Sequence, residues 1–535
     1  MAMIIPSGTQ LCIADRCGVH FWGIHSHDAM WHVEIAAVAF RSFPFQVPTF
    51  AGAILSGYNI LMDLVLYIFS LIGISPLVSL FKVVPVLWFA LLTLTGISFA
   101  TSLNKSVRFV FITLFLIYFA GHFGYLLQLF QEGSMFKGSQ SFSMQSMNAL
   151  LNPQFALTLP IILVQLVILK GRTLTMRLTL LMSFLTFFSL GLKFYGGVVS
   201  LIIAGFYIFE YLISGKNILK SLWFGSIILF ISLASVIIFY NPFAASGSGS
   251  VFIFSPFAIV HSMIEEQNMF YLPDMVNARY YLYEQGWSLR LLGIELFSTL
   301  LYIFLNFGTR LLGLLYVVTQ IIRRKATRFE VYLLATLALS FSFSILLIQK
   351  GDWWNTVQFG YYSIFLATLL TAIALFNMTK HLGKSGTIIV ILFFVFTIPS
   401  SVRAVKEFIT TDTYLVSDQE IAALKVLKNK PDGIVFDSFP STDGSVDYRN
   451  SGYVAAFSQK PLYLAHVGPL RIVGVDATER EQRIEGQDCT VLKNIKYIYY
   501  AKRFNGSFLI SCEDLINSSF QQIFENDEVQ LFQRM

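Results

Sequence analysis

Long apolar stretches recur along the chain between residues 79 and 401, separated by shorter polar segments. Stretches of this length are typical of helices that cross a membrane, because the core helices of soluble proteins are usually shorter. The pattern predicts about ten membrane-spanning helices. They cover residues 83–101, 109–127, 153–169, 178–192, 195–213, 221–240, 298–321, 330–349, 359–377 and 386–401.

The segments after every second predicted span are basic. They contain Lys105 and Arg108, then residues 170–177, 216–220, 323–328 and 380–384, where Lys and Arg recur. Short loops rich in Lys and Arg stay in the cytoplasm. We therefore expect residues 1–80, the alternate loops and everything after about residue 402 to lie outside, in a multi-pass protein of the plasma (inner) membrane.

Residues 58–74 form a further apolar stretch, but they contain Asp63. A span here would invert every later loop, and a carboxylate at mid-membrane costs about 2.5–3.5 kcal/mol. We interpret this segment as an amphipathic helix at the outer interface. The first residues contain no signal peptide, so we expect that a membrane helix precedes this sequence.

The composition changes after Arg403. DQEIAALKVLKNK has a helical pattern, and GIVFDSF, KPLYLAHV, KYIYYAKRF and EVQLFQRM have strand patterns. The prediction is thus an α-helical polytopic membrane protein with a C-terminal outer α/β domain. Its parts are an outer loop over 1–80 with the interfacial helix 58–74, a transmembrane domain over 81–402, and an extracytoplasmic domain over 403–535.

Composition and charge agree with a membrane protein. Only 13% of the 535 residues are charged and the net charge is +6, whereas soluble proteins carry about 25% charged residues. No basic stripe suits nucleic acid. The cysteines form two sequence pairs, Cys12/Cys17 and Cys489/Cys512. Each pair either closes a disulfide, if its compartment is oxidising, or remains as two thiols.

The stretch GIHSHDAMWHVE, residues 23–34, concentrates groups that could carry chemistry. Three interpretations stay open. Asp28 caps a short helix over AMWHVEIAAVAF and the histidines are solvated. Alternatively, His25, His27, Asp28 and His32 bind Zn²⁺ or Mn²⁺, although their spacing matches no strong metal motif. In the third, Asp28 is a general base at a membrane-surface active site.

The segments around Asp28 resemble the first outer loop of membrane glycosyltransferases with the GT-C fold. FPFQVPTFAG and GYNILMDL follow Asp28, and Lys82 in SLFKVVPVLWFALL opens the first predicted span. Five further segments are similar to segments of uncharacterised bacterial members of this superfamily. They are GHFGYLLQLF, MNALLNPQFALTLPI, GLKFYGG, DWWNTVQFGYYSIF and SGYVAAFSQKPLYLAHVG.

This resemblance implies transfer of a sugar from a polyprenyl-phosphate carrier to an acceptor at the outer face, in cell-envelope biogenesis. Asp28 would then be the catalytic carboxylate. The lipid phosphate needs cations at headgroup depth. The candidates for that role are Lys82, Lys193, Arg290 and Arg310. Snorkelling to the interface is the alternative for each of them, and it suits Arg310 least because that residue sits well inside an apolar run.

Trp354, Asn355 and Gln358 belong to a second outer loop. An aromatic ring beside amides suits stacking on a sugar and hydrogen bonding to its hydroxyls. Tryptophans also gather at membrane interfaces without any ligand. Two other functions stay open: a transporter or flippase for a lipid-linked sugar, and a non-catalytic envelope assembly protein. No cofactor is firmly indicated, although a divalent metal fits the histidine-rich stretch.

Overall fold

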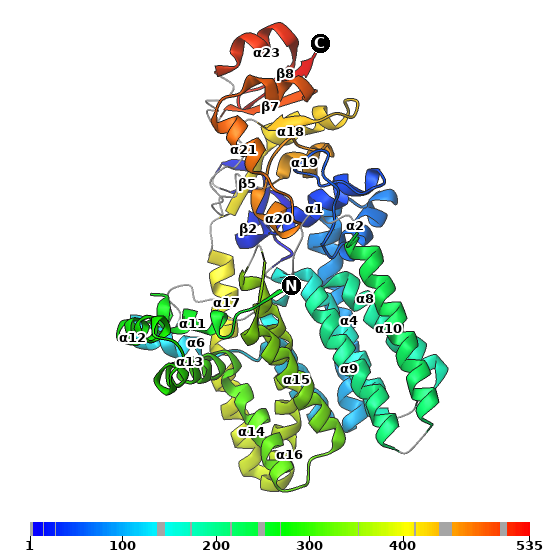
Figure 1. Cartoon of the computed structure of the whole chain (residues 1–535), viewed down its shortest axis with the longest axis vertical. Coiled ribbons are helices and arrows are strands. Elements are labelled where there is room, and N and C mark those ends of the chain that lie inside the picture. Colours follow the sequence, from blue (N-terminus) through cyan, green and yellow to red (C-terminus); the bar gives the residue numbers. More distant parts are fainter. Residues whose placement is uncertain are drawn as a thin grey trace. The chain divides into compact units, whose positions relative to one another are not determined.

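The fold is described from a computed structural model of the whole chain (Figure 1). The described residues are 4–13, 15–26, 28–135, 145–171, 174–214, 217–243, 252–267, 269–350, 353–410, 413–437, 452–502 and 511–535. The chain divides into two compact units. Unit 1 contains residues 1–87, 236–248 and 410–535, and unit 2 contains residues 88–235 and 249–409.

Unit 2 is helical. Seven helices in the described part of the chain are long and apolar enough to cross a membrane, or up to eight if the bent pair over 107–132 is one span. This indicates an integral membrane protein. The helices that lie wholly or mostly in this unit are α4 (Val84–Leu103), α5 (Val107–Phe119), α6 (Gly124–Glu132), α7 (Pro153–Gly171), α8 (Met176–Leu192), α9 (Phe194–Ile213), α10 (Ile218–Tyr240), α11 (Ala258–Glu265), α12 (Pro273–Glu284), α13 (Leu289–Phe307), α14 (Leu311–Ile322), α15 (Arg328–Leu346), α16 (Val357–Thr397) and α17 (Pro399–Thr410).

Each predicted span overlaps helical residues, but the boundaries of the helices differ from those of the predicted spans. The spans expected at 359–377 and 386–401 belong to one helical stretch, Trp354–Lys406, with non-helical backbone at Gly383. The span expected at 178–192 corresponds to α8, one of the shorter apolar helices. The one expected at 298–321 is interrupted where Gly308, at a φ of 54°, ends α13. The number of membrane spans, predicted as about ten, therefore stays a prediction.

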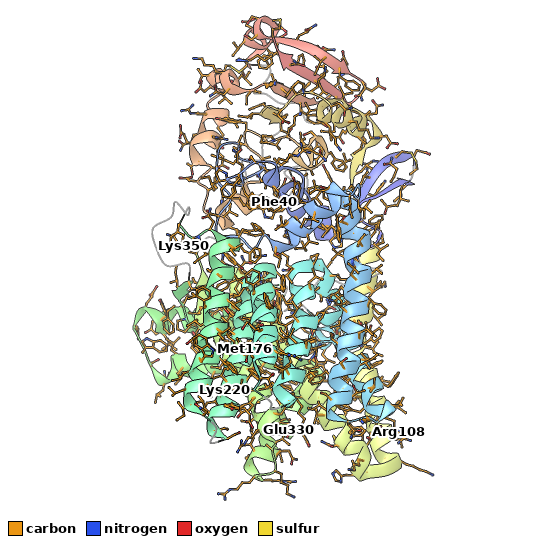
Figure 2. The ribbon with its side chains drawn as sticks, turned by 90° about the vertical axis from the view of Figure 1, so that its right-hand side faces the viewer. Phe40, Arg108, Met176, Lys220, Glu330 and Lys350 are labelled. Atoms are coloured by element: carbon orange, nitrogen blue, oxygen red, sulfur yellow. A yellow bond between two sulfur atoms is a disulfide. The ribbon has the colours of Figure 1, made fainter. Side chains whose placement is uncertain are left out.

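Labelled residues near three of the predicted cytoplasmic loops lie toward the same end of unit 2. Figure 2 shows Arg108, Lys220 and Glu330 toward one end of the helices and Lys350 toward the other. Thr327 caps α15 there, and its backbone N–H and side chain both bond Glu330. Two of the five basic segments, those with Arg108 and Lys220, thus lie toward the same end.

Strands β3 (Phe252–Phe254) and β4 (Leu347–Gln349) pair at the opposite end of unit 2, where Lys350 lies. Beside them, α11 and α13 pack around an apolar cluster. Its buried members are Leu127, Ile259, Val260, Met263, Met269, Tyr302, Leu305 and Val357.

Unit 1 contains residues from both the N-terminal and the C-terminal parts of the chain. Strands β1 (Thr9–Ile13), β2 (Arg16–Trp22) and β5 (Thr413–Ser417) form an antiparallel sheet in the order β1-β2-β5. Its remaining helices are α1 (Asp28–Val38), α2 (Leu61–Leu71), α3 (Pro76–Val78), α18 (Asp418–Lys428), α19 (Tyr453–Ser458), α20 (Val467–Ile472), α21 (Thr478–Glu485) and α23 (Glu513–Ser519). Residues 1–80 and 410–535 of the predicted outer regions therefore lie in one unit, whereas residues 403–409 belong to unit 2.

A second sheet in unit 1 has the order β6-β7-β9-β8. Its strands are β6 (Val435–Asp437), β7 (Tyr497–Ala501), β8 (Phe520–Glu525) and β9 (Val529–Arg534), with only β6 and β7 parallel. The helix expected from DQEIAALKVLKNK is confirmed as α18, and three of the four expected strands are present as β6, β7 and β9.

The strand expected over KPLYLAHV is wrong. Only Leu462 forms an isolated bridge, to Val435, and α20 begins at Val467. Pro461 has no N–H to give to a ladder. The N–H groups of Leu462 and Ala465 bond the carbonyls of Pro48 and Thr49, at 2.8 and 3.0 Å. The segment is therefore extended, but it follows an irregular loop instead of a strand.

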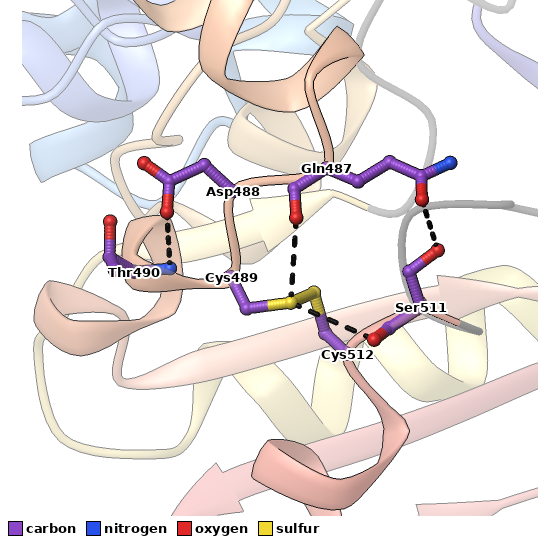
Figure 3. The surroundings of a disulfide bond; sticks show 6 residues. All are labelled: Gln487, Asp488, Cys489, Thr490, Ser511 and Cys512. Carbon is purple, nitrogen blue, oxygen red and sulfur yellow. Dashed lines mark hydrogen bonds between the residues drawn. A yellow bond between two sulfur atoms is a disulfide. The ribbon is translucent and has the colours of Figure 1, made fainter.

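Both cysteine pairs form disulfides. Cys12–Cys17 closes the hairpin of β1 and β2, and Cys489–Cys512 joins the segment before β7 to the start of α23. Figure 3 shows the second bridge, beside Gln487 and Ser511. Asp488 caps the adjacent 3-10 turn through the N–H of Thr490, at 3.0 Å. Of the two alternatives, the pairing of cysteines is thus the one observed.

Candidate functional site

The histidine-rich stretch folds as predicted into a short helix, α1, which starts at Asp28. A carboxylate in the first turn interacts favourably with the positive end of the helix dipole. The next ten residues, Ala29 to Val38, are all buried. Asp28 itself is exposed. The helix therefore presents its first carboxylate at the surface and buries the rest of its length in unit 1.

His32 lies one helical turn after Asp28 and forms a pair with Asp63 of α2. The distance from His32 Nδ1 to Asp63 Oδ1 is 2.9 Å, and the residues are 7% and 0% exposed. A buried carboxylate is costly unless it is paired. The partner explains how Asp63, which marked segment 58–74 as unusual, is accommodated.

Tyr58 completes this group between α1 and α2. Its ring centroid lies 6.1 Å from that of His32 and 6.0 Å from that of Trp31. Burial raises the pKa of Tyr58 well above its ordinary value, and the negative charges of Asp63 and Asp28 raise it further. Both carboxylates thus act on the same phenol, which places Asp28, His32, Tyr58 and Asp63 in one neighbourhood. We call these four residues the α1–α2 cluster.

His25 is held differently. Its Nδ1 lies 2.9 Å from Ser7 Oγ, and its ring packs edge-on against Phe81 at 5.5 Å. Burial lowers its pKa to about 3, although the charge of Asp28 opposes this. His25 is therefore neutral near pH 7. His27 lies outside the described residues.

Glu34 and His466 form a buried pair that the sequence did not reveal. Glu34 Oε1 lies 2.8 Å from His466 Nδ1, and neither side chain is exposed. Burial raises the pKa of Glu34 well above its ordinary value. Gly452 packs against the same carboxyl group, and a side chain there would collide with it. The signal in the sequence is a carboxylate beside the apolar run Ile35–Val38.

The histidine-rich stretch does not assemble a metal site from the described residues. No group of three or more His, Cys, Asp or Glu side chains in that part of the chain is placed to hold an ion. His25 contacts Ser7, and His32 contacts Asp63. A metal ligand set that includes His27 stays a prediction.

Lys82 lies in the same region of unit 1 but is bound to the N-terminal segment. Its ammonium group donates to the carbonyls of Ile5 and Ser7 and to Thr9 Oγ1, the Ser7 bond being 3.1 Å. Ser7 also contacts His25, and the negative charge of Asp28 acts on the pKa of His25. Binding a lipid phosphate would require Lys82 to exchange some of these bonds, so that role stays a prediction.

Arg310 belongs to unit 2 and is completely buried. Its guanidinium donates to Thr368 Oγ1 at 2.8 Å, to the carbonyl of Gly121 at 2.9 Å and to that of Ala120. These carbonyls lie between the end of α5 and the start of α6, where helical bonding stops. The contacts give Arg310 a structural role at this break, and they do not indicate a phosphate site.

The other predicted ligands also belong to unit 2. Lys193 is 9% exposed and links α8 to α9, whereas Arg290 is exposed in the first turn of α13. Trp354 packs against the apolar cluster beside α11 and α13. Gln358 donates to Asn355 Oδ1 at 2.9 Å and accepts from Asn152 at 3.4 Å. The two predicted amides are thus adjacent, while Arg290 is not in their bonding network.

Comparison with models of known protein families and with curated protein sequences found no match for this chain. An exposed carboxylate, a histidine oriented by a second carboxylate, and a nearby lysine can together accept a proton and stabilise charge.

Proposed function

We propose that this protein is a membrane glycosyltransferase of the GT-C type, which transfers a sugar from a polyprenyl-phosphate carrier to an acceptor at the outer membrane face. The observation that carries the proposal is the position of the α1–α2 cluster beside the ends of two candidate spans. The N–H of Gly57 bonds the carbonyl of Tyr240, the last residue of α10, at 2.6 Å. Along the chain, α2 is followed by the candidate span Pro76–Leu103.

This position suits a substrate whose reacting bond lies at headgroup depth. The anomeric carbon of a lipid-linked sugar gains positive charge as its bond to phosphate breaks, and a nearby carboxylate stabilises that charge. Asp28 is the exposed carboxylate of the cluster. An acceptor hydroxyl must also lose its proton during attack, which requires a base within hydrogen-bond reach.

Two further observations support an outer location for unit 1. Both cysteine pairs of this unit are disulfides, and disulfides persist in oxidising compartments. The basic segments alternate with neutral ones along the chain, which separates residues 1–80 and those after about 402 from the cytoplasmic side. Polyprenyl-linked sugars serve as donors on the opposite side of the membrane, where the glycans of the cell envelope are assembled.

The test is sugar transfer in membranes from a labelled polyprenyl-phosphate sugar. Asp28→Asn keeps the shape of the side chain and removes its charge, so we expect transfer to fall by at least about 10²-fold. Asp15→Asn is the matched control, because Asp15 is an exposed aspartate next to β2. Normal transfer by a well-inserted Asp28→Asn protein would remove Asp28 from the site.

The same assay separates the transporter alternative. A flippase would move the labelled lipid across the bilayer of reconstituted vesicles without forming a glycosylated product. Movement of the lipid together with no transfer to any acceptor would replace the glycosyltransferase proposal with that alternative.

A further inference from the structure

The histidines of unit 1 differ in what they can do with a proton. His25 has a pKa lowered to about 3 by burial, so it is a poor base near pH 7. His466 is fully buried against Glu34, where no substrate reaches. His32 keeps 7% of its surface exposed, and it lies one turn from the exposed Asp28. Within the described part of GIHSHDAMWHVE, His32 is therefore the histidine best placed to exchange a proton.

The Asp63 contact determines which nitrogen of His32 is basic. Asp63 is an acceptor when ionised, so His32 Nδ1 carries the proton that bridges the 2.9 Å distance. In the neutral ring the lone pair is then on Nε2. A carboxylate that fixes the tautomer and stabilises the imidazolium is the arrangement by which histidine bases are made effective. Asp63 comes from a different helix, so the fold creates the pair.

We propose that His32 is the catalytic base of the transfer reaction, that Asp63 is its positioning residue, and that Asp28 acts as the charge-stabilising carboxylate. The inference rests on the proposed glycosyltransferase function and divides between two residues the tasks that the family resemblance gives to Asp28. The acceptor oxygen forms a bond to the anomeric carbon while the bond from that carbon to the phosphate oxygen breaks. The acceptor proton passes to His32 Nε2, and the lipid phosphate leaves with the bonding electron pair.

The groups around His32 set the pH dependence. Asp28 and Asp63 contribute negative charge, Tyr58 stays protonated, and Tyr240 adds to the local field at Tyr58. His25 is neutral, and the Glu34–His466 pair lies elsewhere along α1, toward α19. A histidine base loses its activity on the acid side at a higher pH than a carboxylate base does. A carboxylate base would retain activity down to about pH 4.

The experiment measures kcat/KM against pH for full-length protein in membranes, with a labelled polyprenyl-phosphate sugar as donor. For His32→Gln we expect a fall of about 10²–10⁴-fold and loss of the acid limb. For Asp63→Asn we expect a smaller fall and an acid limb shifted to lower pH, because the imidazolium loses its anionic partner. A role in folding alone would not move that limb. His20→Gln is the control, since His20 Nε2 lies near the carbonyl of Arg16 on β2, at 3.4 Å.

The outcomes are distinguishable. If the wild type transfers sugar and His32→Gln keeps the wild-type rate and acid limb, this inference is overturned. The glycosyltransferase proposal then still stands. An acid limb near pH 4 in the wild type has the same two consequences. Absence of transfer by well-inserted wild type overturns both. If His32→Gln fails to insert, the acid limb of Asp63→Asn decides: a shift to lower pH supports the inference, and an unmoved limb overturns it.

Discussion

At the scale of single residues, unit 1 is characterised by ionisable groups that are buried in pairs. Glu34 with His466 and His32 with Asp63 each join segments that are distant in the sequence. Burial without a partner would cost several kcal/mol for each charge. Because their surroundings differ from water, these groups should make stability depend on pH in ways that single substitutions can reveal.

Glu34 should make unit 1 less stable as the pH rises. Its pKa is raised in the folded state, so between about pH 4.5 and that raised value the unfolded chain releases a proton that the folded chain keeps. Stability from this group is full below the unfolded pKa and decreases above it. We expect Glu34→Gln to reduce the loss of thermal stability between pH 5 and pH 8, measured on purified protein in detergent. Glu485→Gln, at an exposed site on α21, is the control, and an equal pH response in both variants would contradict this.

His25 should act in the opposite direction. Its folded pKa of about 3 lies below the ordinary 6.5, so the unfolded chain takes up a proton first as the pH falls. Between pH 7 and pH 5 this should cost about 2 kcal/mol of stability. The expectation for His25→Gln is a melting temperature that changes less over that interval than in the wild type. A full wild-type acid response in the variant would assign the acid sensitivity to other groups.

At the scale of elements, helix breaks in unit 2 are held by specific side chains. Arg310 bonds the carbonyls that α5 leaves unpaired before α6 begins. Phe123 N–H bonds the carbonyl of Leu305 across the same region, at 2.8 Å. A buried acceptor without a partner costs about 1–3 kcal/mol. The break between α5 and α6 is therefore stable only while these donors are present.

Substitution of Arg310 tests this role against the predicted phosphate contact. Arg310→Met should lower stability by about 1–3 kcal/mol for each carbonyl left unpaired, and Arg310→Lys should restore part of it because one ammonium replaces a planar fork. Arg290→Met is the matched control, since Arg290 is an exposed arginine of the same unit. Thermal unfolding in detergent measures the difference. Normal stability together with a raised KM for the lipid donor in Arg310→Met would return Arg310 to the phosphate-binding group.

At the scale of the whole molecule, sidedness is the property on which the proposed function depends. Unit 1 carries the α1–α2 cluster and both disulfides. If the alternating basic loops are cytoplasmic, the site and both bridges face the outside. This topology would place the cysteines in an oxidising compartment, and it would place the site on the side where a lipid-linked donor is available.

Cysteine labelling measures sidedness directly. After mild reduction of intact cells, a membrane-impermeant thiol reagent should label Cys489 and Cys512. Lys325→Cys, in the basic segment before α15, should be labelled only after lysis. The Cys489–Cys512 bridge spans 23 residues, so its removal should also cost about 3 kcal/mol in the chain-entropy model. Labelling of the native cysteines only after lysis would invert the topology and move the proposed site to the cytoplasm.

Local pattern was sufficient for the helices and for most of the C-terminal elements. Apolar length predicted the membrane helices, and the run AMWHVEIAAVAF predicted α1. Propensity and alternation found α18, β6, β7 and β9. KPLYLAHV was not a strand because residues 48–51 take up its backbone groups. That competition comes from a segment about 400 residues away, which no local pattern contains.

What the sequence alone determined is the membrane character of the chain, its alternating basic loops and the group of ionisable residues before α2, since each depends on composition within a short window. Only the tertiary structure decided that His32 meets Asp63, that Glu34 meets His466, and that Arg310 bonds the carbonyls between α5 and α6. Partners of this kind are set by which helices pack together. A hydrogen bond depends on atoms about 3 Å apart, whereas the sequence separation of these pairs ranges from 31 to 432 residues.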